Sequence, residues 1–146
     1  MEEYTLGAGS ASGGGISNNN IGNGFPSLAY SSDGPIVAWV GGSADVDIYV
    51  RRWNGSAWVE IGTGSASGGG ISNTVEWSSS PSVTIVTDGP IVAWSDDSNA
   101  GEIYVRRWNG VAWVDTGAGS SMDGGVSDND GDSFNPLVVF APDDKL

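Results

Sequence analysis

An internal repeat of 55 residues constrains the fold of this chain more than any other feature. Pro26, Pro81 and Pro136 recur at this spacing, and 32 of the 55 positions are identical between residues 6–60 and residues 61–115. Self-similarity at a fixed period is typical of architectures in which each repeat packs only on its neighbours. The chain is therefore expected to consist of copies of one supersecondary unit.

Within one period the pattern predicts four short β-strands and no helix. Apolar, β-branched and aromatic runs predict strands at residues 26–30, 35–40, 47–53 and 57–61. Asn54-Gly55 is the strongest hairpin signal, because both residues tolerate the positive φ of a two-residue type I′ turn. Four strands joined in sequence by hairpins form an antiparallel meander, and a Gly/Ser/Asn-rich linker of roughly 15 residues leads to the next unit.

These features predict an all-β protein of the β-propeller class, built of 55-residue four-stranded antiparallel blades. Runs such as Ile36-Val37-Ala38-Trp39 are apolar on both faces of the strand, as expected for a sheet covered on both sides. A chain of 146 residues is too short for a closed propeller, which needs four or more blades of roughly 40–50 residues each. The ring is therefore expected to be completed by homo-oligomerisation.

The period divides the chain into four parts. Residues 1–25 provide the last strand of a preceding blade plus a loop, residues 26–80 and 81–135 are two blades, and residues 136–146 begin a third. Two blades alone expose two apolar faces, so we expect the partner to be the chain itself, as a dimer or trimer. A blade shared between chains would still lack its two middle strands, which indicates non-standard packing of the termini or an engineered or truncated fragment.

Composition excludes several classes of function. Eighteen acidic and five basic residues give a net charge of −13, so neither nucleic acid nor an anionic membrane surface is expected as a partner. No His and no Cys is present, which excludes imidazole or thiolate zinc sites and His-based triads. No carboxylate pair suited to glycoside hydrolysis stands out, and no catalytic residue is assigned; the chain is predicted not to be an enzyme. No signal peptide and no membrane span is predicted.

Arginine is confined to one repeat position. Four of the five basic residues are Arg51-Arg52 and Arg106-Arg107, at the same place in both copies of the third strand. In the structural interpretation, one Arg of each pair stacks on a Trp and pairs with an acidic residue of the adjacent strand. Alternation places Arg51 with Trp53 on one face of the strand and Arg52 on the other.

The alternative is a glycan site, in which arginine donates to ligand hydroxyls beside a tryptophan ring. Its candidate residues are Arg51, Trp53, Arg106 and Trp108, with Trp77 as an aromatic that has no counterpart in the other repeats. No cofactor is expected apart from a candidate calcium site. Asp128, Asp130 and Asp132 supply hard oxygen ligands around a glycine, although ordinary turn chemistry explains the same composition.

Residues 48–59, Ile-Tyr-Val-Arg-Arg-Trp-Asn-Gly-Ser-Ala-Trp-Val, and their copy at 103–114 resemble the Trp-Asp-Gly-x-Gly-Trp blade motif of fucose-binding β-propeller lectins. The resemblance implies two blades per chain, a trimeric six-bladed ring, glycan partners and an extracellular location. That family's sugar-binding Arg and Glu fall at Val37 and Val50 here, and at Val92 and Val105 in the copy. The resemblance therefore bears on fold and assembly, and not on fucose binding.

Two functional classes follow from these patterns. The first is a non-enzymatic propeller module that self-assembles into a closed ring. The alternative is a lectin that holds glycans in pockets between blades. A sialidase-like enzyme is a weaker third class, because the chain has too few arginines outside the third strand.

Overall fold

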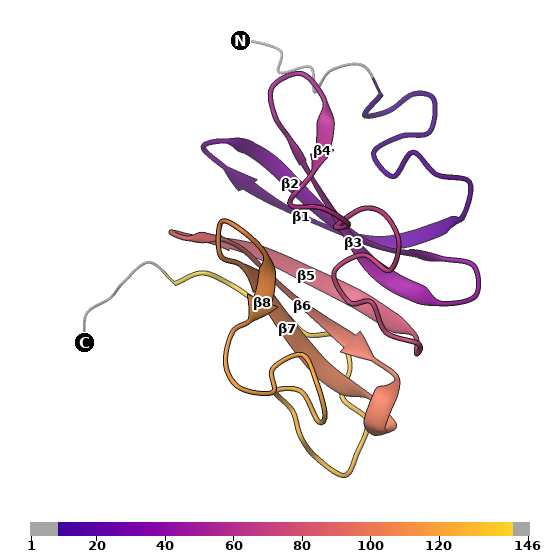
Figure 1. Cartoon of the computed structure of the whole chain (residues 1–146), viewed down its shortest axis with the longest axis vertical. Coiled ribbons are helices and arrows are strands. Elements are labelled where there is room, and N and C mark those ends of the chain that lie inside the picture. Colours follow the sequence, from indigo (N-terminus) through magenta and orange to yellow (C-terminus); the bar gives the residue numbers. More distant parts are fainter. Residues whose placement is uncertain (1–8, 142–146) are drawn as a thin grey trace.

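The computed structural model describes residues 9–141 and shows two four-stranded antiparallel sheets (Figure 1). Sheet A has the strand order β1-β2-β3-β4 and sheet B the order β5-β6-β7-β8, so both are simple meanders. The strands are β1 (Gly22–Ser31), β2 (Gly34–Gly42), β3 (Val46–Trp53), β4 (Trp58–Glu60), β5 (Ser78–Val86), β6 (Gly89–Asp96), β7 (Glu102–Trp108) and β8 (Trp113–Asp115), with a 3-10 turn η1 (Ser98–Ala100) between β6 and β7. The predicted all-β class and the repeated meander are confirmed.

The hairpin at Asn54 forms, but not as a two-residue turn. Trp53 pairs with Trp58, which leaves a four-residue loop in which Gly55 has a positive φ and Asn54 does not. The Asn54 side chain instead accepts hydrogen bonds from the backbone N–H of Ser56 (3.0 Å) and Ala57 (2.8 Å). Asparagine thus stabilises this loop through its side chain rather than through a left-handed backbone.

The first strand of each sheet begins earlier than predicted because it contains a bulge. Pairing of β1 with β2 starts at Gly22 and shifts register between Gly24 and Ser27, an interval that contains the repeated proline, Pro26. Phe25, Ser80 and Asn135 occupy the same repeat position and have φ values of 48°, 50° and 53°. The bulge leaves the proline, which has no N–H to donate, outside the ladder of paired residues, so the strand can continue on both sides of it.

Each sheet has two apolar faces. Face 1 carries Ile36, Ala38, Val40, Ile48 and Val50 in sheet A, and Ile91, Ala93, Ser95, Ile103 and Val105 in sheet B. Face 2 carries Val37, Trp39 and Tyr49 in sheet A, and Val92, Trp94 and Tyr104 in sheet B. Face 1 of sheet A packs on face 2 of sheet B, and their residues form the main core together with Ile61, Ile71 and Val83. Figure 1 shows sheet A above sheet B, with their faces toward each other.

The linker between the sheets is bonded to β3 and is not a free loop. The Ile71 N–H donates to the Ile48 carbonyl (2.8 Å), and the Val50 N–H donates to the Ser65 carbonyl (2.7 Å). The second linker repeats both bonds on β7, from Val126 to Ile103 and from Val105 to Ser120. The linkers therefore satisfy the outer edge of the third strand where the short fourth strand ends.

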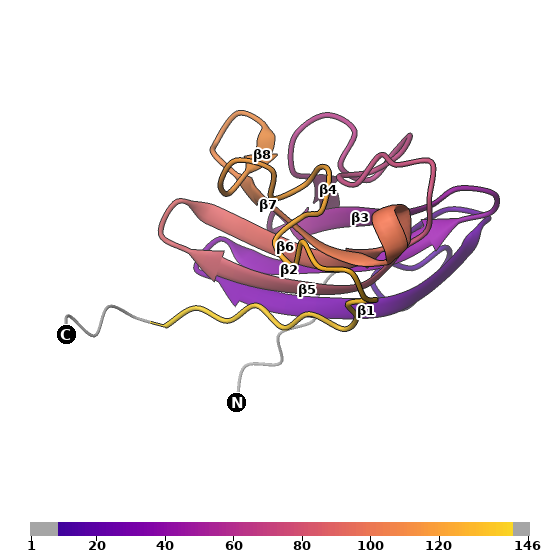
Figure 2. The same ribbon diagram turned by 90° about the horizontal axis from the view of Figure 1, so that it is seen from below.

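Beyond the second linker, residues 134–141 run extended alongside β5 (Figure 2). The Val138 N–H donates to the Ser82 hydroxyl at 3.0 Å, as the Val83 N–H of β5 donates to the Ser27 hydroxyl of β1 at 3.0 Å. Of the segment predicted to open a third unit, residues 136–141 therefore sit on β5 as β5 sits on β1, but they are not paired as a strand. The remainder of that segment, and the start of the chain where the last strand of a preceding blade is predicted, lie outside the described residues. Across residues 9–141, no helix has the length and apolar character that crossing a membrane would require.

Candidate functional site

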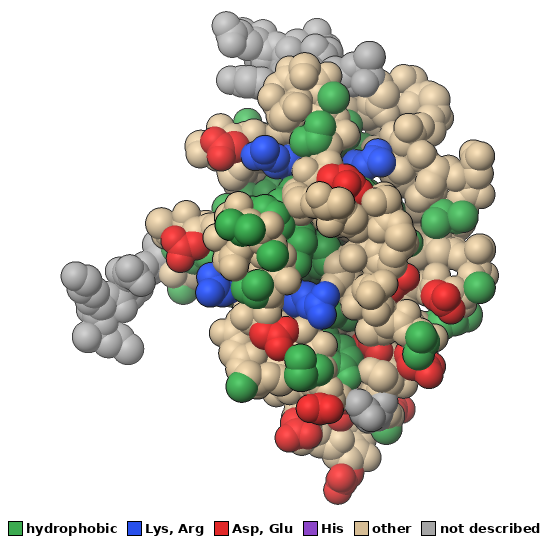
Figure 3. All heavy atoms as spheres, in the orientation of Figure 1, with side chains coloured by type: hydrophobic (Ala, Val, Ile, Leu, Met, Phe, Trp, Pro, Cys, Tyr) green, Lys and Arg blue, Asp and Glu red, His purple; other side chains and the backbone are tan. Residues whose placement is uncertain are grey.

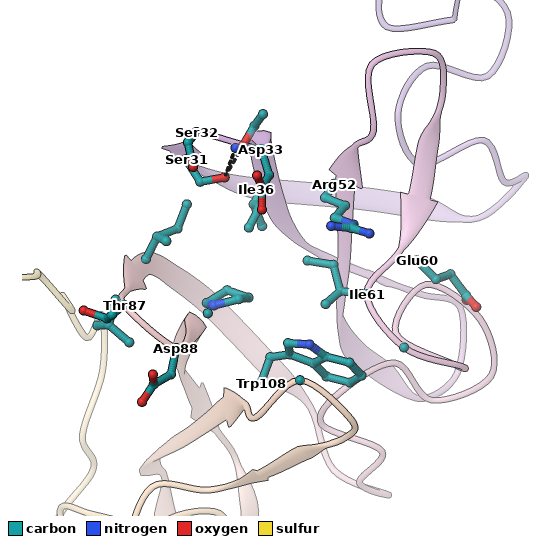
Figure 4. A pocket seen from close by; sticks show the side chains of 17 residues that line it. Ser31, Ser32, Asp33, Ile36, Arg52, Glu60, Ile61, Thr87, Asp88 and Trp108 are labelled. Atoms are coloured by element: carbon teal, nitrogen blue, oxygen red, sulfur yellow. Dashed lines mark hydrogen bonds between the residues drawn. The ribbon is translucent and has the colours of Figure 1, made fainter.

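Sheets A and B diverge at one end and leave a pocket of about 670 Å³ between them (Figure 4). The pocket lies where the β1–β2 and β5–β6 hairpin turns meet the ends of β3 and β7. Its wall combines one cation, one indole ring, the carboxylates of two turns and a few apolar groups; the residues that define it are Asp33, Ile36, Arg52, Ile61, Asp88 and Trp108.

Arg52 supplies the positive charge of this pocket. It lies opposite Ile36 in the register of β2 and β3, so its side chain is on face 1, which faces sheet B. Figure 4 shows the Arg52 guanidinium directed into the space between the sheets. The side chain is exposed and bonds to no other residue in the described part of the chain. Its donors are therefore available to a ligand.

Trp108 forms the opposite wall. Its ring packs on Gly62, where a Cβ would overlap the indole, and Gly62 has a φ of +79°. The ring of Trp113 lies 6.0 Å away at an interplanar angle of 56°, and its indole N–H donates to the Ile61 carbonyl (2.8 Å). Glycine is thus needed on the linker so that the aromatic ring can lie against the backbone between the sheets.

The acidic groups of the pocket come from the two Asp-Gly hairpin turns. Asp33 and Asp88 are exposed at its rim, and Figure 4 shows both on the β-turn side, across from Arg52 and Trp108. Glu60 borders the pocket, but its carboxylate accepts hydrogen bonds from the Gly64 (3.2 Å) and Ala66 (3.0 Å) N–H groups. Burial raises the pKa of Glu60, but hydrogen bonds from Ser67, Ala66 and Gly64 and the charge of Arg51 outweigh it, and the net pKa is lowered.

Arg51 and Arg106 lie on face 2, away from this pocket, and bind the linkers. The Arg51 guanidinium donates to the Ile16 carbonyl (2.7 Å), and Arg106 donates to the equivalent Ile71 carbonyl (2.6 Å). Arg106 also donates from Nε to the Ser121 hydroxyl (2.9 Å). Each arginine lies opposite an acidic residue, Glu60 or Asp115, in the strand register. In the structure both side chains hold a carbonyl of the linker that precedes their own sheet.

The predicted tryptophans are separated. Of the three, Trp108 lines the pocket, and Trp53 packs against Trp58 with ring centroids 5.9 Å apart. Trp77 is 60% exposed and lies at the opposite end of sheet B, where its carbonyl accepts a hydrogen bond from the Asp97 N–H (2.9 Å). Sequence analysis did not single out Arg52 for the site, although alternation had already placed it on the other face from Arg51.

Asp128, Asp130 and Asp132 are not assembled into a metal centre. No group of three acidic side chains that could hold a metal ion occurs within residues 9–141. Asp128 has a φ of 37° and donates its N–H to the Gly124 carbonyl (2.8 Å), as Asn73, with a φ of 48°, does to Gly69. The structure therefore gives Asp128 the turn role that asparagine has in the preceding repeat.

Three buried acids were not identified from the sequence. Asp47, Asp96 and Glu102 are 4%, 0% and 2% exposed and accept hydrogen bonds from linker and strand groups. Asp47 accepts from the Ser72 hydroxyl (2.8 Å) and the Thr74 N–H (3.2 Å), and Glu102, its repeat, accepts from Ser127. Burial raises the pKa of Asp47, and the charges of Asp45 and Asp96 add to this, against the lowering effect of the two hydrogen bonds. These acids fasten each linker to its sheet.

A comparison with protein-family models, curated proteins and solved structures finds no match to this chain. What the structure defines is an all-β protein of two repeated antiparallel meanders. The function must therefore be inferred from the open faces and from the pocket.

Proposed function

We propose that this chain is a non-enzymatic module that associates head to tail with copies of itself into a closed β-propeller ring. One observation carries the proposal: the two faces that no other sheet covers are the same kinds of face that join sheet A to sheet B, one face 1 and one face 2. Face 2 of sheet A and face 1 of sheet B have no sheet packed on them within residues 9–141. A heterologous contact of this kind generates a ring when its rotation closes.

Two pairs of repeated residues differ in exposure according to whether a neighbouring sheet covers them. Val83, on face 2 of sheet B, is 6% exposed, whereas its counterpart Leu28 in sheet A is 62% exposed. Ile71, between the sheets, is 2% exposed, whereas its counterpart Val126 beside face 1 of sheet B is 54% exposed. These two pairs are buried where a neighbouring sheet covers them and exposed where none does, which supports association through those faces. The centre of face 2 of sheet A is buried as well, with Val37, Trp39 and Tyr49 at 6%, 4% and 7% exposure, because Ile16, Trp58 and Ala66 pack on it in place of a sheet.

Mass by light scattering tests this proposal. The chain has a mass of 14.9 kDa, and the expected result is a discrete multiple of that value, with dimer or trimer as the candidate sizes. A discrete size is expected because a closed ring leaves no free face. A stable monomer at micromolar concentration would contradict the proposal, and so would an open-ended series of sizes.

The pocket between the sheets supports a second candidate function, the binding of a neutral saccharide. Sugar hydroxyls both donate and accept hydrogen bonds, and Arg52 offers donors while Asp33 and Asp88 offer acceptors. The ring of Trp108 offers a flat apolar surface for the C–H face of a sugar. An anionic ligand is less favoured, because two carboxylates lie at the rim and the chain carries a net charge of −13.

A glycan array with two variants tests the second candidate. Arg52→Gln is expected to weaken binding at least about tenfold, because it removes charged hydrogen bonds that the folded chain does not use elsewhere. Trp77→Ala is the control, because Trp77 is exposed outside the pocket. Absence of binding to every glycan, or an equal effect of the two substitutions, would contradict saccharide binding here and would leave self-association untouched.

A further inference from the structure

One combination of linker and strand occurs three times, at residues 9–31, 64–86 and 119–141. The middle copy ends in β5 of sheet B, and its linker binds both sheets. It is fixed to sheet A by the bonds of Ile71 to Ile48 and of Ser65 to Val50, and to sheet B by the hydrogen bond from Arg106 to the Ile71 carbonyl. The middle copy therefore shows what a complete junction between two sheets requires.

The outer copies each make half of these contacts. Residues 119–141 repeat the bonds to the sheet before them, through Val126 with Ile103 and Ser120 with Val105. Residues 9–31 repeat the bond to the sheet after them, from Arg51 to the Ile16 carbonyl, and include β1. If two chains associate as sheets A and B do, residues 119–141 of one chain and residues 9–31 of the next must compete for a single place.

We infer that in the assembly residues 119–141 of one copy replace residues 9–31 of the next copy. Residues 134–141 then pair with β2 of that copy in place of β1, and the Val126 carbonyl accepts the hydrogen bond from its Arg51. This inference rests on the proposed self-association and specifies how each junction closes. It also removes the difficulty that a blade shared between chains would lack its two middle strands, because β2 and β3 of the acceptor supply them.

Residues 119–141, the C-terminal copy, are expected to occupy the junction in place of residues 9–31, because the C-terminal copy is better anchored to its own chain. Glu102 holds the second linker through Ser127 and the Asn129 N–H, and the Ser120 hydroxyl donates to the Val105 carbonyl. The C-terminal strand is also more apolar, with Leu137, Val139 and Phe140 at 82%, 70% and 47% exposure, at the positions of Ser27, Ala29 and Tyr30 in β1. Ala29, the counterpart of Val139, is half-buried in β1, so pairing with β2 would cover Val139 in the same way.

The backbone of residues 134–141 is oriented for this pairing. The Val83 N–H points to Ser27, away from β6, so alternation directs the Thr84 N–H toward β6. The Val138 N–H likewise points to Ser82, which leaves the Val139 N–H on the side where β2 of an acceptor would lie. Ala29, the counterpart of Val139, pairs with Ile36, so Val139 is expected opposite Ile36 of the second copy.

The substitution Val139→Pro distinguishes strand replacement from an assembly in which the faces of the sheets only stack. Val139→Pro removes an N–H that bonds to no group within residues 9–141, so the free chain should fold, which circular dichroism checks. Self-association, measured by light scattering across a dilution series, is expected to weaken at least about 100-fold, because a paired strand does not tolerate proline at such a position. Val139→Ala keeps the N–H and is expected to associate nearly as the wild type does.

A cysteine pair provides the second readout, and the chain has no cysteine of its own. Ile36→Cys with Val139→Cys should give disulfides between chains, and Ile36→Cys with Ala29→Cys should give a disulfide within one chain that retains β1 and blocks association. A wild-type monomer would contradict the proposed function itself. An oligomer that tolerates Val139→Pro, or that forms no 36–139 disulfide, would contradict strand replacement alone.

Discussion

At the scale of single residues, the junction between the sheets depends on Gly62, where the Trp108 indole leaves no room for a side chain. Gly62 and Gly64 both have positive φ, +79° and +89°, but the indole of Trp108 fills the space at Gly62, whereas nothing lies within 4 Å of a Cβ at Gly64. Gly64→Ala should cost about 1 kcal/mol of unfolding free energy for the left-handed backbone alone. Gly62→Ala should cost about 1–3 kcal/mol more, because the indole must move.

Urea denaturation of the two variants measures this difference. The Trp108 ring also forms the pocket wall, so tryptophan fluorescence should change for Gly62→Ala and stay constant for Gly64→Ala. Equal losses of stability would mean that the contact between Gly62 and Trp108 contributes nothing to the junction.

Two acids of sheet A should make opposite contributions to the dependence of stability on pH. The pKa of Asp47 is raised above 3.8 in the folded chain, so the folded state binds the proton more tightly, and this contribution to stability grows as pH falls from neutral toward 3.8. The pKa of Glu60 is lowered below 4.5, so its contribution is present above 4.5 and is lost as pH falls through the folded pKa.

Unfolding midpoints between pH 3 and pH 7 for Asp47→Asn and Glu60→Gln test these signs. Asp47→Asn should remove a gain of stability on acidification, and Glu60→Gln should remove a loss. If both variants change the slope of stability against pH in the same direction, the description of one of these two environments is wrong.

At the scale of elements, the linkers are ordered parts of the sheets, and arginine on face 2 is one of their supports. Arg106→Lys should destabilise the fold by about 1.5–3 kcal/mol, because lysine cannot bond the Ile71 carbonyl and the Ser121 hydroxyl from one planar group. Arg107→Lys is the matched control, because the Arg107 side chain lies on the other face and makes no hydrogen bond or ion pair to another described residue. The thermal unfolding midpoints of the two variants test this prediction, and equal midpoints would contradict the supporting role of Arg106.

The sequence was sufficient for the order and pairing of the four strands in each sheet, because the repeat shows each signal twice and the hairpin turns have strong local chemistry. It was not sufficient for the bulge. The residue with positive φ at this position is Phe25, Ser80 or Asn135 in the three copies, so no single residue type marks the position in the sequence. The linkers were predicted as plain loops, because the serines that bond them to β3 and β7 also suit flexible segments. Their order depends on long-range pairing that local composition does not encode.

The candidate site was predictable only in part for a related reason. Period-two alternation separates Arg51 from Arg52, but it does not say which face of sheet A meets sheet B. Arg52 enters the pocket because face 1 of sheet A is the joined face, which is a property of two sheets and not of one strand. Trp108 could be identified as a candidate because it recurs beside arginine in the sequence. The arginine that shares its pocket is nevertheless Arg52, from the other sheet.

At the scale of the whole molecule, charge and apolar surface are arranged in different places. The net charge of −13 opposes association of copies, so the open faces must offset this repulsion by apolar burial. Figure 3 shows arginine side chains bordering an area of apolar side chains between the sheets, with acidic side chains spread around them. Acidity therefore keeps the outer surface hydrated while the faces remain free to pack.

A single negative charge on the open side of sheet B should prevent self-association. Val126, 54% exposed, occupies the place where Ile71 is buried to 2% at the joined faces, so Val126→Glu would put a carboxylate where a neighbouring sheet must exclude water. Val111→Glu is the control, since Val111 is 84% exposed in the hairpin loop between β7 and β8 and adds the same charge to the chain. Light scattering should show a folded monomer for Val126→Glu and the wild-type mass for Val111→Glu. If both variants dissociate, general charge repulsion controls association; if neither does, the copies meet through some other surface.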